Sequence, residues 1–264
     1  MSQTSSPEPS GQRRTALVTG PTAGIGRAFA DQLAKRGDDL VLVARDVARL
    51  EEVAAELRSA YGVQVEVLTA DLGDRAELAT VEARVADRAR PVDLVVNNAG
   101  FGLKKGFLAN DVEQEQAMLD VLVTAVMRIS HAAGAAMSER GGGGVINVSS
   151  VAGFLPRGSY GAAKAYVTSF SRWADATYRG QGVRYMALCP GFVKTEFHQR
   201  MDVSRGSAPG FMWLDADDLV SAALSDFDKG KSLSVPSVQY KAITTVAKYT
   251  PAGLQARFQS LGRK

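Results

Sequence analysis

Short apolar runs alternate with longer amphipathic stretches along most of the chain. Runs rich in Val, Leu and Ala predict buried strands at 16–19, 40–44, 65–71, 93–98, 145–150 and 184–191, with a seventh near Leu233. An apolar period of 3.6 residues predicts helices at 25–35, 47–62, 76–89 and 113–137, and another that holds Tyr160 and ends near Tyr178. Strand and helix therefore follow one another in regular alternation.

This alternation predicts an α/β fold. Continuous apolar strands separated by helices indicate a parallel sheet that is covered on both faces. We expect a single doubly wound Rossmann-type domain over residues 13–264, with about seven strands and no internal repeat. Ligands in such folds bind at the carboxyl ends of the strands, so the residues just after each strand are the candidates for function.

Three segments stand outside this alternation. Residues 1–12 are polar and rich in Pro and Ser, which is typical of a disordered tail and not of a signal peptide. Residues 192–214 form a long stretch with aromatics and methionines, which we interpret as a lid over an apolar substrate. Residues 239–264 are amphipathic and basic, and we expect a C-terminal helical segment that covers the core.

Composition narrows the classes of function. A net charge of +3 with interspersed acids argues against nucleic-acid binding. The two histidines, His131 and His198, have no ligand pattern around them, so we expect no metal. No apolar run approaches the length of a membrane span, so stable membrane insertion is not expected. The single cysteine, Cys189, excludes an intrachain disulfide and favours a reducing, cytoplasmic location.

The turn after the first strand reads TGPTAGIG, from Thr19 to Gly26. Glycines at a strand-to-helix turn let backbone N–H groups approach a phosphate at the positive end of the helix. The spacing G-x-x-x-G-x-G is not the common dinucleotide fingerprint. By itself the turn fits a phosphate site and a turn without a ligand equally well.

The second predicted strand ends at Ala44 and Arg45, where many NAD sites hold a carboxylate for the ribose 2′-hydroxyl. An arginine there suits a 2′-phosphate, so the sequence favours NADP(H), with NAD(H) as the alternative. Arg45 as a solvated loop residue, partly offset by Asp46, is the other interpretation.

Tyr160 and Lys164 lie one helical turn apart in SYGAAK. This spacing has two interpretations: an ordinary pair on the surface of a helix, or a pair in which the ammonium acts on the phenol. The rest of the chain favours the second interpretation. With TGPTAGIG, NNAG (97–100), SSVAG (149–153), YGAAK (160–164) and PGFVKT (190–195) in this order, the chain resembles the classical short-chain dehydrogenase/reductase family over residues 13–230.

The resemblance implies a role for each matching position. The catalytic residues would be Ser150, Tyr160 and Lys164. The cofactor would be held by Gly20, Thr22, Gly24, Ile25 and Gly26 at the pyrophosphate, Arg45, Asp71 and Leu72 around the adenosine, Asn98, Ala99 and Gly100 near the ribose, Tyr160 and Lys164, and Pro190, Gly191, Val193 and Thr195 near the nicotinamide. The resemblance also implies a homodimer or homotetramer, associated through the long helix and the tyrosine-bearing helix.

These residues suit the reduction of a carbonyl by hydride transfer. Negative charge develops on the carbonyl oxygen, so a proton donor and a hydrogen-bond donor must stand beside it. Tyrosine has a reference pKa of about 10, and we expect the ammonium of Lys164 and the oxidised nicotinamide to lower the pKa of Tyr160.

The chain departs from the family pattern at two places. Leu122 stands where an asparagine of the long helix commonly helps to hold a water that connects the lysine to solvent. Another group then takes that role, or proton relay is slower, or the register differs by a residue or two, with Asp120 as the nearest polar alternative. Only ten positions separate Ser150 from Tyr160, which predicts a short loop and an altered pocket wall.

The expected substrate is a small-molecule carbonyl or alcohol, with a bulky apolar body. We expect the loop 101–107, Phe154, Leu155 and the segment 192–214 to form the pocket, and the chain is similar to the subgroup of 3-oxoacyl and 17β-hydroxysteroid reductases. Lys104, Lys105, Lys194 and Arg200 are candidates for an anionic handle. A dinucleotide-binding regulator or scaffold without turnover is the alternative function, favoured only by Leu122, and a membrane-associated reductase is a third.

Overall fold

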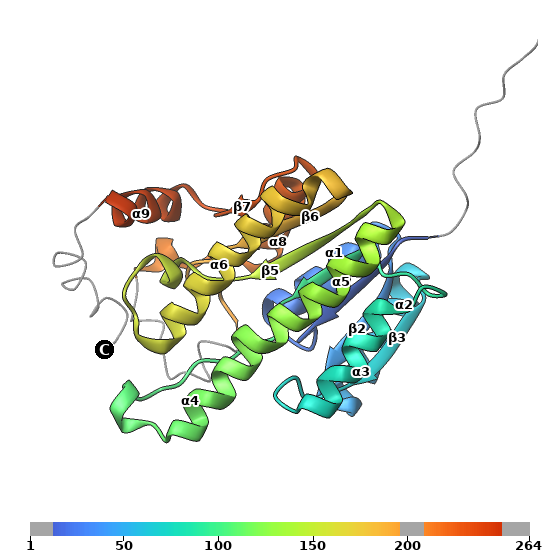
Figure 1. The fold of residues 1–264 in the computed structure, drawn as a ribbon, viewed down its shortest axis with the longest axis horizontal. Helices are drawn as coiled ribbons and strands as arrows, with labels where there is room; N and C mark the ends of the chain where they lie inside the picture. The colour runs from blue at the N-terminus through green and yellow to red at the C-terminus, as the bar shows by residue number, and fades with distance from the viewer. Residues whose placement is uncertain (1–12, 196–208, 250–264) are drawn as a thin grey trace, which may run out of the picture.

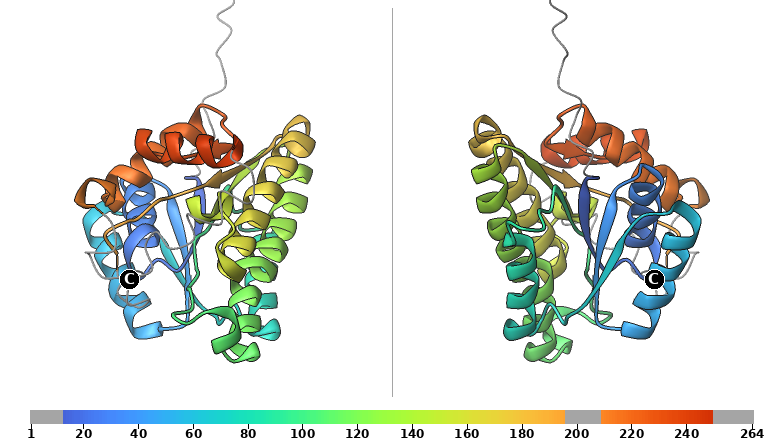
Figure 2. Two further views of the ribbon diagram at one scale, coloured as in Figure 1. Left: turned by 90° about the vertical axis from the view of Figure 1, so that its left-hand side faces the viewer. Right: turned by 90° about the vertical axis from the view of Figure 1, so that its right-hand side faces the viewer.

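The fold is a three-layer sandwich with a parallel sheet in the middle (Figures 1 and 2). The computed structural model describes residues 13–195 and 209–249. Its seven strands are β1 (Thr15–Thr19), β2 (Asp39–Ala44), β3 (Val65–Thr69), β4 (Leu94–Asn97), β5 (Gly143–Val148), β6 (Val183–Leu188) and β7 (Leu233–Ser234). They lie in the order β3-β2-β1-β4-β5-β6-β7, and every pairing is parallel. The predicted doubly wound fold is confirmed.

Helices cover both faces of the sheet, as Figure 2 shows. One face carries α1 (Gly24–Lys35), α2 (Val47–Tyr61) and α8 (Ala216–Asp228), and the other carries α3 (Arg75–Ala86), α5 (Val126–Arg140) and α6 (Gly158–Tyr178). Alternate strand residues supply the two cores: Val18 and Leu42 pack with α1, whereas Leu17 and Val41 pack toward α3 and α5. Burial of both faces explains why the strands are continuously apolar.

Shorter elements complete the chain. They are η1 (Phe107–Ala109), α4 (Val112–Leu119), η2 (Asp120–Ala125), η3 (Val151–Phe154), η4 (Arg179–Gln181), η6 (Gly210–Met212) and α9 (Val238–Tyr249). The predicted tail at 1–12, the middle of the predicted lid at 196–208 and the end of the C-terminal segment at 250–264 lie outside the described residues.

The predicted long helix at 113–137 is three consecutive pieces. α4 and α5 are α-helical, and the six residues of η2 between them form a π-helix. By length and composition alone, the continuous segment Val112–Arg140 is also apolar enough to cross a membrane. The buried helices of globular proteins meet the same criterion, and 44% of the apolar window is buried here.

The order of the strands places the candidate site. The chain winds outward from β1 to β3 and then returns to the middle of the sheet at β4, so the direction of winding reverses between β1 and β4. Such a reversal leaves a crevice at the carboxyl ends of the two strands. Thr19 and Asn97 are the last residues of these strands, so the Gly-rich turn and the NNAG motif meet there.

Candidate active site

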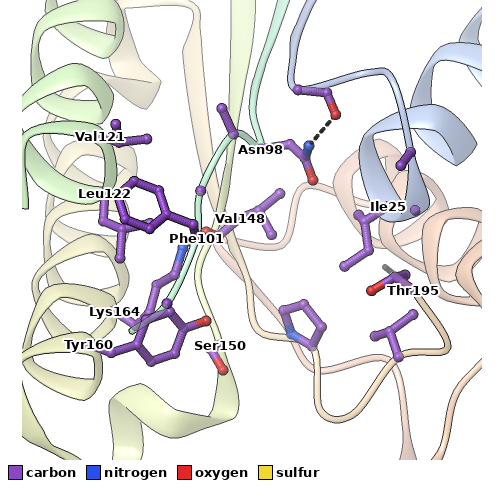
Figure 3. Close-up of a pocket in the computed structure, with 18 of the residues that line it drawn as sticks. Ile25, Asn98, Phe101, Val121, Leu122, Val148, Ser150, Tyr160, Lys164 and Thr195 are labelled. Carbon is purple, nitrogen blue, oxygen red and sulfur yellow. Dashed lines mark hydrogen bonds between the residues drawn. The ribbon is translucent and has the colours of Figure 1, made fainter. Parts of the chain in front are cut away.

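A cavity of about 1160 Å³ opens along the carboxyl ends of the strands (Figure 3). Every residue predicted for catalysis or cofactor binding lines it except Gly26. A Cβ on Gly26 would stand 2.0 Å from the carbonyl oxygen of Gly20, so Gly26 serves the close packing of the turn behind the cavity wall. The structure therefore brings together motifs that are spread over 175 positions, from Gly20 to Thr195.

The start of α1 has features that suit an anion. Gly20 and Gly24 have φ values of 66° and 56°, which side-chain-bearing residues rarely adopt. The N-cap residue Ala23 makes no side-chain cap, and the first turn of α1 contains no acidic residue. The first N–H groups of a helix have no intrahelical acceptor, and the residues that begin α1, Gly24 and Ile25, line the cavity.

Asn98 fixes the Gly-rich turn against the neighbouring strand. Its side-chain amide donates to the carbonyl oxygens of Thr19 at 2.9 Å and Gly20 at 3.0 Å. Figure 3 draws one of these two bonds as the dashed line from Asn98. The Thr19 hydroxyl accepts from the backbone N–H groups of Asn98 and Ala99, each at 2.9 Å. The side chain of the second asparagine of NNAG therefore orders the turn, and residues 98–100 also line the cavity.

The far end of the cavity carries opposite charges. Arg45 follows β2, and its guanidinium lies 3.5 Å from the carboxylate of Asp71. The Arg45 side chain is 74% exposed and the Asp71 side chain 42% exposed. Arg49, in the first turn of α2, also lines the cavity and was missed in the sequence, although it lies only four residues after Arg45. Two arginines, Arg45 and Arg49, and two aspartates, Asp71 and the N-cap residue Asp46, therefore line this part of the cavity wall.

Ser150 and Tyr160 meet on the opposite wall. Ser150 is the N-cap of η3, and its hydroxyl oxygen accepts from the Ala152 N–H at 3.1 Å, which leaves the hydroxyl proton free to be donated. Figure 3 shows this hydroxyl beside the phenol oxygen of Tyr160, with which it forms a hydrogen bond. The short loop packs tightly, because a Cβ on Gly153 would lie 2.8 Å from the backbone of α6 at Lys164.

Lys164 reaches the same wall from one turn further along α6. Its ammonium donates to the carbonyl oxygen of Val148 at 2.7 Å, and it lies 5.8 Å from the centroid of the Tyr160 ring. The Ser149 hydroxyl donates to the Lys164 carbonyl oxygen at 2.7 Å and so joins the end of β5 to the middle of α6. Backbone and side chain of Lys164 are therefore both fixed by the strand end that carries Ser150.

Burial dominates the acid–base properties of this pair. It raises the pKa of Tyr160 to about 12, and the hydrogen bond with Ser150 lowers it only in part. Burial also lowers the pKa of Lys164 to about 8. In this structure burial outweighs any lowering of the Tyr160 pKa by the ammonium of Lys164, which donates to Val148. The further lowering expected from an oxidised nicotinamide stays a prediction.

Leu122 occupies the cavity wall where the family asparagine is expected. It is buried, belongs to an apolar cluster with Met118 and Ala163, and packs near Tyr160. Asp120, the polar alternative, bonds to Gln116 at 3.0 Å and does not line the cavity. Leu122, which aligns with the family asparagine, therefore presents an apolar side chain to the site.

Two expected pocket residues lie elsewhere. Phe154 and Leu155 do not line the cavity, because the 3-10 turn η3 directs Phe154 into an apolar cluster with Tyr240 and Val235. Among the residues expected to hold an anion, Lys104 lines the cavity, whereas Lys105 and Lys194 do not and Arg200 lies outside the described residues. Residues that sequence reasoning missed line the wall instead: Val121, Val148, Ala152 and Arg157.

The family follows from comparison with known proteins. The family model described as short chain dehydrogenase matches residues 14–205. The chain belongs to the short chain dehydrogenase family. It is an oxidoreductase, and within its described residues no group of three or more His, Cys, Asp or Glu side chains is placed to hold a metal ion.

Relatives of this short chain dehydrogenase include enzymes with different substrates. The very-long-chain 3-oxoacyl-CoA reductase of Anas platyrhynchos is 32% identical over 216 residues, which are 79% of this chain and 67% of that protein. The galactitol 2-dehydrogenase (L-tagatose-forming) of Cereibacter sphaeroides is 35% identical over 191 residues, which are 70% of this chain and 74% of that protein.

Solved structures show the same architecture. A short-chain dehydrogenase from Sphingobium yanoikuyae in complex with NADPH is 34% identical, with a TM-score of 0.82 over 92% of this chain and 95% of that one. The bulky-bulky ketone specific alcohol dehydrogenase from Comamonas testosteroni is 29% identical, with a TM-score of 0.78 over 92% and 94% of the two chains.

Proposed function

We propose that this short chain dehydrogenase is an NADP(H)-dependent oxidoreductase that interconverts a carbonyl and a secondary alcohol on a bulky apolar substrate. One observation carries the proposal: Ser150, Tyr160 and Lys164 come together on one wall of a cavity whose other end is an anion site. An ordinary surface pair would have an exposed lysine, whereas Lys164 is 5% exposed and Tyr160 is half-buried.

The site fits a nicotinamide dinucleotide phosphate. The uncapped N-terminus of α1 suits the pyrophosphate, and Arg45 with Arg49 suits a 2′-phosphate. Ala44, at the end of β2, supplies no carboxylate to repel that phosphate. Asp71 opposes this preference through its contact with Arg45, so NAD(H) stays the alternative cofactor.

The residues of the chain divide the chemistry between them. When bound, the reduced nicotinamide supplies the hydride. The phenol of Tyr160 holds its proton at neutral pH, because its pKa is raised to about 12, and it gives this proton to the carbonyl oxygen. The Ser150 hydroxyl, held in place by the Ala152 N–H, donates a hydrogen bond to the same oxygen. Lys164 places a positive charge behind the phenol.

The walls support an apolar substrate. The same cavity that Ser150 and Tyr160 line is also lined by the apolar side chains of Phe101, Leu103, Val121, Leu122, Val151 and Phe192. Apolar walls with a few convergent polar groups are typical of sites for hydrophobic small molecules. The acyl and bulky-ketone substrates in the names of two relatives agree with this choice.

We also propose a cytoplasmic homodimer or homotetramer. Tyr166 and Trp173 on α6 are 39% and 54% exposed, and Met127 on α5 is 40% exposed. Tyr166 stacks on Phe170 at 5.9 Å between centroids, so the outer face of α6 carries an aromatic row. Exposed apolar rows of this kind suit a subunit contact. Light scattering of Trp173→Glu, expected to be smaller than the wild type, tests it.

Turnover tests the proposed function. The oxidation of NADPH and NADH is followed by nicotinamide absorbance against a panel of apolar ketones and 3-oxoacyl thioesters. We expect NADPH to be consumed faster, and Tyr160→Phe to retain cofactor binding without turnover. A wild type that binds NADPH but reduces nothing in the panel, including after Leu122→Asn, supports the regulator or scaffold without turnover.

A further inference from the structure

Glu115 is a buried carboxylate outside the candidate catalytic residues. It lies on α4 and is 5% exposed, although glutamates are rarely buried without a partner. Its partners in the described part of the chain are neutral. One carboxylate oxygen accepts from the Asn110 amide at 2.7 Å, and the other accepts from the Ser159 hydroxyl. A buried charge held in this way indicates a specific role.

The Asn110 side of this contact leads to the cavity. The Asn110 amide also donates to the carbonyl oxygen of Lys105 at 3.3 Å, and the Asn110 N–H donates to the carbonyl of Gly106 at 3.2 Å. Leu103, Lys104 and Gly106 of the same loop line the cavity. The carboxylate therefore fixes one end of a loop whose other residues face the substrate.

The Ser159 side leads to the phenol. Ser159 directly precedes Tyr160, in the first turn of α6. That helix has no side-chain cap from its N-cap residue Arg157 and no acidic residue in its first turn. Glu115 brings a negative charge from α4 to this positive helix end, which the sequence of α6 itself leaves uncompensated.

We propose that Glu115 is a positioning residue that couples the cavity loop 103–110 to the first turn of α6, and so sets the position of the Tyr160 phenol. The proposal rests on the proposed function for its kinetic consequence. A substrate that displaces the loop then also shifts the Tyr160 phenol, through the contacts of Asn110, Glu115 and Ser159.

Glu115→Gln tests the coupling, because a carboxamide keeps the size but offers only one acceptor to two donors. We expect kcat for a bulky ketone to fall about tenfold, the loss of roughly one hydrogen bond to a charged group, with little change in KM for NADPH. Glu113→Gln, an exposed change on the same helix, is the matched control and should leave kcat unchanged.

Hydrogen exchange measures the coupling without turnover. In Glu115→Gln, the backbone amides of 103–110 and 158–165 should exchange faster together, and in Glu113→Gln neither should change. If Glu115→Gln does not fold, Ser159→Ala replaces it, with the same expectation for both segments. Unchanged exchange, or faster exchange in only one of the two segments, would overturn the proposal. A wild type without turnover would count against the proposed function, while the exchange result still decides the coupling.

Discussion

The side chain of Leu122 packs against Gly100 so closely that a Cβ on Gly100 would lie 2.7 Å from the Leu122 Cδ2 atom. The contact joins η2 to the NNAG motif on the cavity wall. It also explains why a leucine is compatible with this site, because the missing side chain of the glycine provides the room that the larger residue needs.

We expect Leu122→Asn to destabilise the protein without a gain in activity. The amide would be buried in the cluster of Met118, Ala163 and Tyr160, which offers it no evident partner apart from the phenol. The loss of apolar contacts and the unpaired amide should cost about 2–4 kcal/mol of unfolding free energy. Chemical denaturation measures this, with Leu122→Met as the control of similar volume. A rise in kcat would show instead that the missing asparagine limits the wild type.

The rate of carbonyl reduction should fall as the pH rises through about 8. Burial lowers the pKa of Lys164 to about 8, so the ammonium loses its proton in this range, whereas the phenol of Tyr160 with a pKa raised to about 12 keeps its own. Above this pH, the phenolate that forms on proton transfer has no positive partner. A kcat profile from pH 6 to 10 checks the prediction.

Lys164→Arg provides the control for that profile. A guanidinium stays protonated in proteins, so any activity that this variant retains should not fall near pH 8. Cys189→Ser should leave the wild-type profile in place, because burial raises the pKa of the Cys189 thiol to about 11 and keeps it neutral there. If kcat of Lys164→Arg still falls near pH 8, the group that titrates in this range is not Lys164.

Arg45→Ala should reduce the preference for NADPH over NADH by about tenfold or more, since a charge-assisted hydrogen bond to phosphate contributes about 1.5–3 kcal/mol. The dissociation constants of the two cofactors, measured by fluorescence titration, give the preference directly. Arg36→Ala is the control, because Arg36 pairs with Asp228 away from the cavity. An equal loss of affinity for both cofactors would mean that Arg45 does not distinguish them.

Tyr240→Phe should destabilise the protein by about 1–3 kcal/mol, the cost of leaving buried polar groups unpaired. The Tyr240 hydroxyl accepts from the Phe192 N–H at 3.0 Å and donates to the Met212 carbonyl at 2.8 Å. It thus holds together both described ends of the segment 192–214. Urea denaturation measures the loss, and Tyr61→Phe, on the exposed side of α2, should change stability by less than about 0.5 kcal/mol.

The strands and the motifs at their ends could be predicted from the sequence, because burial on both faces requires continuous apolar runs. The carboxyl ends of parallel strands then bring the following residues to one edge of the sheet. Ser150 and Gly20 lie together on the cavity for this reason, though they are 130 positions apart.

Other features depend on packing that no local pattern records. The direction of Phe154 is decided by a 3-10 turn, whose four residues carry no apolar period. The raised pKa of Tyr160 follows from burial by neighbours on other elements, which the spacing of Tyr160 and Lys164 does not reveal. The Glu115 contact crosses between α4 and α6, 44 positions apart.

The π-helix between α4 and α5 changes how positions in this region should be counted. A residue advances an α-helix by about 100°, and a π-turn contains about one residue more than an α-turn. Along Asp120–Ala125 the chain thus carries one residue beyond what a straight α-helical count allows. A relative that lacks this residue would match α4 or α5 in a gap-free alignment, but not both. An alignment with such a relative needs a gap within 120–125. Without the gap, a residue of the relative would be matched to a residue on the wrong face of the helix in this chain.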